Sequence, residues 1–222
     1  MIEGVYKHLA GRRPMLLDQS ARLISAVLLP LVEDEGGLKI LFEVRPRHLN
    51  RQPGEICFPG GRIEKFTDSN PLATAIRETS EELVIAEEDI EVIGPLDIMA
   101  SPLGTLIHPY VGRLKATEIR PDPNEVEECF TVPVDFLLAD PPYATEVEVA
   151  TRYRTDFPLD KVPPTYKEGW QVRTTYPMFF YEYNQYFIWG LTGILLFNFL
   201  STCWPDHPTF KKPFKKWPAA PG

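Results

Sequence analysis

The chain has 222 residues, of which 44% are hydrophobic and 24% charged, enough to bury one substantial core but not two full domains. A net charge of −8 argues against nucleic acid as a partner, because nucleic-acid backbones attract basic proteins. Cys57, Cys129 and Cys203 are too widely separated for a Cys-x-x-Cys metal site, and an odd number of cysteines does not indicate a disulfide framework. Together with the lack of an export signal near the N-terminus, this pattern predicts a soluble, cytoplasmic protein.

The N-terminal part predicts an arm followed by a β-hairpin. Residues 1–20 have a weak pattern interrupted by Pro14, so we expect an arm or a short helix there. A single domain is expected to span residues 21–204. It begins with a buried strand at 23–32, a turn, and an antiparallel partner at 38–45. A polar loop and a short strand at 56–58 then lead to Pro59-Gly60-Gly61.

The clearest helix follows this glycine turn. Asn70 is a typical N-cap and Pro71 suits the first helical position, so the helix is expected to run to about Leu83. Downstream, the pattern predicts strands at 90–99, 107–114 and 179–189 and short helices at 133–138 and 191–200. Residues 140–176 read as long connections and edge strands, and the basic, proline-rich residues 205–222 as a flexible tail.

One apolar segment has two interpretations. Residues 186–204 contain no charge and approach the minimum length of a membrane-spanning helix. However, Gly190, Gly193 and Asn198 interrupt the segment, and an aromatic strand followed by a core helix accounts for the same residues. We therefore expect no membrane span.

The residues that carry chemistry lie in the predicted helix. Arg77, Glu78, Glu81 and Glu82 form an R-E-x-x-E-E sequence, whose offsets of three and four place the glutamates along one helix face. Such carboxylates repel one another unless a pKa rises or a cation binds, and hard oxygen ligands suit Mg²⁺ or Mn²⁺. A solvated helix face is the alternative interpretation. The preceding Phe-Pro-Gly-Gly turn and the loop acids Glu64 and Asp68 favour a ligand site.

This combination resembles the Nudix box, G-x5-E-x7-R-E-U-x-E-E-x-G-U with U aliphatic, from Gly61 to Ile85. The loop is two residues longer than in the pattern, because Arg77 lies 77 − 61 = 16 positions after Gly61 rather than 14. Asp68 is the nearest replacement for the loop glutamate, and Val84 stands where the pattern has glycine. The resemblance implies an α/β fold, an α/β/α sandwich around a mixed β-sheet, with the box as a loop-helix-loop motif.

A second motif resembles the coenzyme A pyrophosphatase branch of that family. The sequence L-F-E-V-R at 41–45 and the glycine turn at 58–61 match its pattern L-L-T-x-R-S-x-x-x-R-x-x-x-G-x-x-x-F-P-G-G, although the second arginine falls on Asn50 with Arg51 beside it. The branch implies hydrolysis of coenzyme A or a derivative to 4′-phosphopantetheine and adenosine 3′,5′-bisphosphate. ADP-ribose, NADH and dinucleoside polyphosphates are alternatives.

The residue roles follow from this reading. We expect Glu78, Glu81 and Glu82 to bind Mg²⁺ or Mn²⁺, with Glu81, Glu82 and Glu125 taking part in catalysis. Glu127 and Glu128 are the other loop candidates for the general base. Substrate contacts are expected from Arg45, Arg51, Phe58, Gly60 and Gly61, and support of the site from Arg77 and Asp68.

Two other classes of function remain open at this point. The longer box loop and Val84 are compatible with a nucleotide-binding module that has no turnover. The apolar residues 186–204 are compatible with a membrane-attached protein. The expected partner is a small nucleotide diphosphate, not nucleic acid or a membrane. A homodimer is compatible with the resemblance, since dimers are common among similar proteins.

Overall fold

A mixed sheet of eight strands forms the centre of the protein. The computed structural model describes residues 2–11, 23–64, 67–102, 104–116 and 118–217. The sheet contains β1 (Leu23–Asp34), β2 (Gly37–Val44), β3 (Ile56–Cys57), β4 (Gly60–Arg62), β5 (Ile90–Pro95), β6 (Met99–Ala100), β7 (Thr105–Leu114) and β8 (Glu128–Pro133). Its main path is β3-β2-β1-β7-β5, with β4 paired to β1, β6 to β7 and β8 to β2. Because β1 pairs antiparallel with β2 and parallel with β7, the sheet is mixed.

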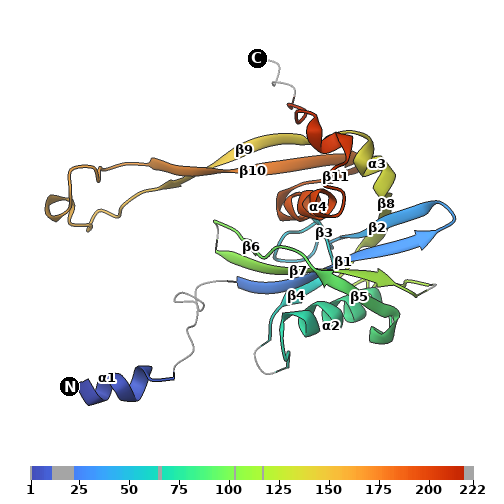
Figure 1. Cartoon of the computed structure of the whole chain (residues 1–222), viewed down its shortest axis with the longest axis horizontal. Coiled ribbons are helices and arrows are strands. Elements are labelled where there is room, and N and C mark those ends of the chain that lie inside the picture. The colour runs from blue at the N-terminus through green and yellow to red at the C-terminus, as the bar shows by residue number, and fades with distance from the viewer. Residues whose placement is uncertain (1, 12–22, 65–66, 103, 117, 218–222) are drawn as a thin grey trace.

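Helices cover the two faces of this sheet. Figure 1 shows α2 (Pro71–Leu83) on one face and α4 (Gly190–Cys203) on the other. Side chains alternate between the faces of a strand, and β1 supplies both layers: Ala26 and Leu28 pack with α2, whereas Leu29 and Leu31 belong to the larger core on the side of α4. This arrangement confirms the predicted α/β/α sandwich around a mixed sheet.

A second sheet lies beyond α4. It consists of β9 (Tyr143–Thr151), β10 (Gln171–Tyr183) and β11 (Tyr186–Ile188), and α3 (Val134–Ala139) connects it to the main sheet. Figure 1 shows the β9–β10 ribbon projecting well past the rest of the molecule, with the short 3₁₀ helix Leu159–Lys161 near its tip. We refer to residues 143–183 as the arm. The expected edge strands at 140–176 are thus two long strands paired with each other.

The apolar segment at 186–204 folds as a strand and a core helix, as expected. Strand β11 ends at Ile188, and α4 begins two residues later and buries Leu195, Leu196 and Phe199. Among the described residues, no helix has both the length and the apolar character needed to cross a bilayer.

The two ends of the chain both contain short helices, of which the N-terminal one was among the expectations. Helix α1 (Ile2–Leu9) lies within the expected N-terminal arm, while residues 12–22 fall outside the described residues. At the C-terminal end, the 3₁₀ helix Pro208–Lys211 follows α4, and the Thr209 hydroxyl donates to the Leu138 carbonyl. Phe214 packs against Phe179 and Phe197 at centroid distances of 5.4 and 5.5 Å. Up to residue 217 the tail therefore packs on the fold, in contrast to the flexible tail expected from its prolines and charges.

Several strands differ from the sequence prediction, and the single strand expected at 179–189 is a hairpin in which the end of β10 pairs with β11. Strand β8 was not expected, because its surroundings read as a loop rich in proline and acidic residues. It pairs with β2 over six residues, so the long-range partner decided its conformation. The strand expected at 90–99 is divided into β5 and β6, with a register shift between Val92 and Gly94.

Candidate active site

Helix α2 presents the acidic residues of the box from a well-defined start. The Asn70 side chain accepts a hydrogen bond of 3.0 Å from the Ala73 N–H, and Pro71 opens the helix, as the sequence predicted. Thr74, Thr79 and Leu83 are buried against the sheet, so the helix cannot rotate without exposing them. Glu78 and Glu82, one turn apart, are thereby directed toward β4.

Close approach of β4 to α2 depends on two glycines. The Gly60 N–H donates a hydrogen bond of 2.8 Å to Oε2 of Glu82. Gly60 has φ +151°, and a Cβ there would lie 2.6 Å from Cα of Val27. A Cβ on Gly61 would occupy the position of the Glu78 carboxylate. Because these two glycines have no side chain, β4 can approach α2 closely enough to accommodate the carboxylates of Glu78 and Glu82.

Arg77 connects the box loop to three carboxylates. Its Nε lies 3.0 Å from Oδ1 of Asp68, its Nη2 2.8 Å from Glu78 and its Nη1 2.9 Å from Glu81. Asp68 is buried and also accepts from the Thr74 hydroxyl and the Glu64 N–H, both at 2.9 Å. The hydrogen bond from Arg77 lowers the pKa of Asp68 to about 2, so this carboxylate stays charged as an anchor.

Glu81 occupies a different position from the other two helical glutamates. Its side chain is 57% exposed, bonds to Arg77 and does not line the cleft described below. An i, i+4 ion pair with Arg77 is the arrangement that a purely structural role would produce.

The loop before β8 carries Glu125 toward α2. The Asp122 N–H donates to the Glu82 carbonyl at 2.9 Å, and the N–H groups of Glu125 and Val126 donate to the Asp122 carbonyl at 3.0 and 2.8 Å. The next residue, Glu127, donates its N–H to the Val44 carbonyl at 2.8 Å. These bonds anchor the loop at both ends, so Glu125 has a defined place beside the end of the helix.

A cleft of about 590 Å³ joins these elements. Of the residues predicted for the site, those that line it are Arg45, Arg51, Phe58, Gly60, Gly61, Glu78, Glu82 and Glu125. Leu191, Thr192 and Leu195 of α4 form an apolar wall, and the Thr192 hydroxyl bonds to the Ile56 carbonyl at 2.9 Å. The tertiary structure thus places arginines and carboxylates from distant parts of the chain around one cleft of ligand size.

Glu43 is an acidic residue of this region that the sequence analysis missed. It lies in the middle of β2, where it is paired with Cys57 of β3 and Cys129 of β8, and only 1% of the residue is exposed. Its Oε1 has no hydrogen-bond partner among the described residues. Burial, and then the charge of Glu82, raises the pKa of Glu43. A glutamate in the otherwise apolar strand L-F-E-V, where the branch pattern has threonine, was the available signal.

The chemistry of these side chains suits a divalent cation. The pKa of Glu82 is raised to about 8: burial is the largest cause, the charges of Glu78 and Glu125 add to it, and the Gly60 hydrogen bond opposes it. A nearby cation would relieve that repulsion. Hard carboxylate oxygens are the ligands that Mg²⁺ and Mn²⁺ prefer. Among the described residues, no group of three or more His, Cys, Asp or Glu side chains is arranged so that it could hold a metal ion.

The backbone conformation of Val84 shows why the box pattern has glycine at this position. Val84 ends α2 in the left-handed conformation, φ 51° and ψ 52°, and its N–H donates to the Ser80 carbonyl. Glycine adopts this conformation without strain, whereas a β-branched residue does so at a cost. The helix nevertheless ends in the same way, because the Ser80 hydroxyl also bonds to the Ile85 carbonyl at 2.7 Å.

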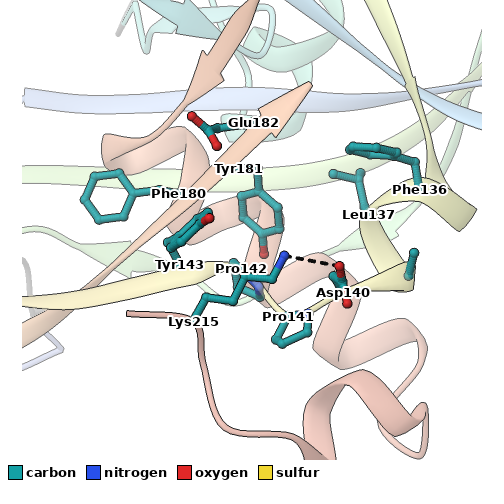
Figure 2. Close-up of a pocket in the computed structure, with 11 residues that line it drawn as sticks. Phe136, Leu137, Asp140, Pro141, Pro142, Tyr143, Phe180, Tyr181, Glu182 and Lys215 are labelled. Carbon is teal, nitrogen blue, oxygen red and sulfur yellow. Dashed lines mark hydrogen bonds and ion pairs between the residues drawn. The ribbon is translucent and has the colours of Figure 1, made fainter. Parts of the chain in front are cut away.

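A second hollow, of about 180 Å³, lies at the base of the arm (Figure 2). It is formed by α3, β9, β10 and the C-terminal segment, and Lys215 pairs there with Asp140 at 3.3 Å. The buried Tyr181 hydroxyl has no hydrogen-bond partner among the described residues. None of the residues predicted for the site lines this hollow, and its lysine is already paired with a carboxylate. The cleft beside α2 is therefore the candidate active site.

Comparison with known proteins agrees with this geometry. A NUDIX domain model matches residues 22–153, and the chain belongs to the Nudix hydrolase family. The peroxisomal coenzyme A diphosphatase NUDT7 of Mus musculus is 39% identical over 114 residues, which cover 51% of this chain and 48% of that protein. The peroxisomal coenzyme A diphosphatase ndx-8 of Caenorhabditis elegans is 38% identical over 149 residues, 64% of this chain and 62% of that protein.

A bacterial relative aligns over more of its own length. The Nudix hydrolase NudL of Pectobacterium atrosepticum is 33% identical over 173 residues, which cover 78% of each chain. By contrast, this chain spans only about half to three fifths of the two diphosphatases.

Proposed function

We propose that this protein uses Mg²⁺ or Mn²⁺ to hydrolyse the diphosphate bond of a nucleoside-diphosphate-linked substrate. We further propose coenzyme A or a derivative as that substrate, with 4′-phosphopantetheine and adenosine 3′,5′-bisphosphate as products. The observation that carries the proposal is one cleft lined by Glu78, Glu82 and Glu125 together with Arg45 and Arg51. The relatives named as coenzyme A diphosphatases support the choice of substrate.

The acidic side of the cleft fits cation binding. Glu78 and Glu82 are the proposed ligands, since both face the cleft from one turn of α2 and repel each other without a cation. The charge of Glu82 also raises the pKa of the buried Glu43, so a cation beside Glu82 would relieve repulsion with this carboxylate as well. A divalent cation supplies charge neutralisation at the phosphates and a more acidic water. We assign Glu81 a lesser role than the sequence suggested, because it bonds to Arg77 at the surface.

The remaining roles are assigned to groups around the cleft. Glu125 is proposed to accept the proton of the attacking water, and the anchoring of its loop to the end of α2 supports this role. Arg45 and Arg51 would bind the diphosphate, for which a guanidinium is well suited through paired hydrogen bonds. Burial raises the pKa of the Cys57 thiol far above its usual range, so Cys57 is proposed to line the cleft without acting as a nucleophile.

The test measures turnover of coenzyme A and of ADP-ribose, each with and without Mg²⁺. Glu82→Gln replaces the buried carboxylate, and Glu81→Gln is the matched control on the exposed side of the same turn. We expect metal-dependent cleavage of coenzyme A that Glu82→Gln reduces by roughly 100-fold or more, as is typical when a charge-stabilising group is lost. Glu81→Gln should change it far less.

The outcomes separate the parts of the proposal. Cleavage of ADP-ribose alone would retain the reaction but reject coenzyme A as the substrate. Binding of both nucleotides without cleavage of either would reject the enzyme and favour a nucleotide-binding module.

A further inference from the structure

The arm exposes one long edge of β9. Strand β9 pairs with β10 on one side, from Tyr143 to Thr151. On its other side the C-terminal segment is hydrogen-bonded to the base: the Ala144 N–H donates to the Lys215 carbonyl at 2.9 Å, and the Lys215 N–H to the Pro142 carbonyl at 3.1 Å. The next residues, Lys216 and Trp217, line a hollow together with Glu146 and Glu148. Figure 2 shows Lys215 beside Tyr143 at this base. Beyond residue 144, the described part of the chain provides no strand on that edge.

The backbone groups of this edge point outward in a regular pattern. In an antiparallel ribbon, the N–H and C=O of alternate residues point to the same side. Because Ala144 directs its N–H away from β10, the residues that present N–H and C=O groups at the open edge are Glu146, Glu148 and Ala150. Unpaired edges of this length act as templates for another strand unless they are protected. A two-stranded ribbon is also only marginally stable by itself.

The charges along this edge are complementary to those of a second copy that runs in the opposite direction. Residues 145–155 read T-E-V-E-V-A-T-R-Y-R-T. Counted outward from Ala150, Glu148 matches Arg152, Glu146 matches Arg154, and threonines stand at both ends. If two copies align antiparallel about Ala150, residue i faces residue 300 − i, so each glutamate faces an arginine of the other copy.

The four charged side chains are available for such pairing. Glu146, Glu148, Arg152 and Arg154 are all exposed and occupy alternate positions, which places them on one face of an extended chain. Neither glutamate forms an ion pair within the described structure. Arg154 lies 3.6 Å from an equally exposed Asp156, and Arg152 lies over the Trp170 ring at 5.1 Å from its centroid. These contacts at the surface compete weakly with a directly opposed carboxylate.

We propose that β9 pairs antiparallel with β9 of a second copy of this chain, with the two-fold axis at Ala150. The two arms then form one continuous four-stranded sheet, β10-β9-β9-β10. Strand β9 ends at Thr151, and residues 152–154 follow it without a helix or turn, so the proposed pairing requires them to extend the strand by three residues. Directly opposed charges of opposite sign stabilise antiparallel strands, and like charges there destabilise them. The contact is narrow, so the expected product is a weak dimer whose population depends on concentration.

A cysteine at the axis tests the register. In this arrangement the two Ala150 residues form a hydrogen-bonded pair with Cα atoms about 5.5 Å apart, a separation that a disulfide can span. Ala150→Cys, in a Cys203→Ser background that removes the exposed native thiol, should form a disulfide-linked dimer on mild oxidation. Glu148→Cys in the same background is the control, because it would face Arg152 rather than its own copy. Equal cross-linking of both variants would overturn the register.

Charge exchange tests the pairing itself. Sedimentation velocity over a range of concentrations should show a monomer–dimer equilibrium for the natural chain. Glu146→Arg with Glu148→Arg should weaken the dimer by about tenfold or more, because like charges would then face each other in four places. Arg152→Glu with Arg154→Glu should do the same. The variant with all four substitutions should dimerise again, since its pattern is complementary with the signs exchanged.

Dimerisation of the variant with all four substitutions would show that the double substitutions disrupt pairing between copies and do not unfold the arm. A natural chain that stays monomeric at all concentrations would overturn the proposal. So would a dimer that ignores both double substitutions, because it would have to form through another surface.

Discussion

The backbone N–H of Gly60 donates a hydrogen bond of 2.8 Å to the carboxylate of Glu82, 22 residues further along the chain. This contact joins the glycine turn to the last turn of α2. It also opposes the effect of burial on the Glu82 pKa, because a hydrogen bond to the charged form favours ionisation. The turn and the helix therefore act as one unit in the candidate active site.

Gly61 should not tolerate even a methyl group. In Gly61→Ala, the new Cβ would occupy the position of the Glu78 carboxylate, so the proposed metal ligand must move. We expect hydrolysis to fall roughly 10- to 100-fold, since a displacement of about 1 Å can cost that much. Gly94→Ala is the control, because a Cβ there meets no atom within 4 Å. Steady-state turnover of both variants decides this, and a fully active Gly61→Ala would contradict the proposed role of Glu78.

Asp68 should contribute more to stability than Glu81, although both bond to Arg77. Asp68 is buried and receives further hydrogen bonds from Thr74 and Glu64, whereas Glu81 is mostly exposed. Asp68→Asn should lower the free energy of unfolding by about 1–3 kcal/mol, as for other hydrogen bonds to charged groups. Glu81→Gln should lower it by less than about 1 kcal/mol. Urea denaturation at pH 7 measures both, and equal losses would refute this difference.

Without divalent cations, the protein should become less stable as the pH rises from about 4.5 to about 8. Burial raises the pKa of Glu82 in the folded state from an ordinary value of 4.5 to about 8, so within this range the folded state binds more protons than the unfolded state. Stability falls with rising pH under that condition, here by an amount on the order of 5 kcal/mol.

Thermal unfolding with a chelator present at several pH values measures this slope. Glu82→Gln should make the slope shallower, because the amide does not titrate, while Glu43 and Glu78, whose pKa values burial also raises, still contribute to it. Mg²⁺ should oppose the loss at pH 8 by favouring the charged carboxylates. A natural chain whose stability rises over the same interval would show that the carboxylate is not destabilised by burial.

Val84→Gly should make the protein more stable. Val84 has φ 51° at the end of α2, and its side chain is mostly exposed, so little packing is lost on its removal. Relief of the left-handed strain should raise the free energy of unfolding by about 1 kcal/mol. Val172→Gly, also at a largely exposed valine but in β10 and without positive φ, should lower it instead. Chemical denaturation compares the two, and a destabilised Val84→Gly would indicate that the strain is negligible.

Local signals in the sequence were sufficient for much of the fold. The Asn70 cap, Pro71 and the spacing of apolar residues predicted α2, because these are interactions between near neighbours in the chain. Two apolar runs separated by a turn predicted β1 and β2 and therefore the hairpin. The box residues also predicted which family the chain belongs to, since they bring the chemical groups together within one loop and one helix.

Tertiary structure decided what depends on partners far along the chain. Glu43 became part of the acidic region because β2 lies between β3 and β8, and Glu81 was directed outward because α2 packs its opposite face, with Thr79 and Leu83, on the sheet. Strand β8 and the arm formed through pairing with distant strands, which no local pattern specifies. The sequence alone determined which groups the protein carries, and long-range packing determined which of them face the cleft, because burial and charge depend on neighbours in space.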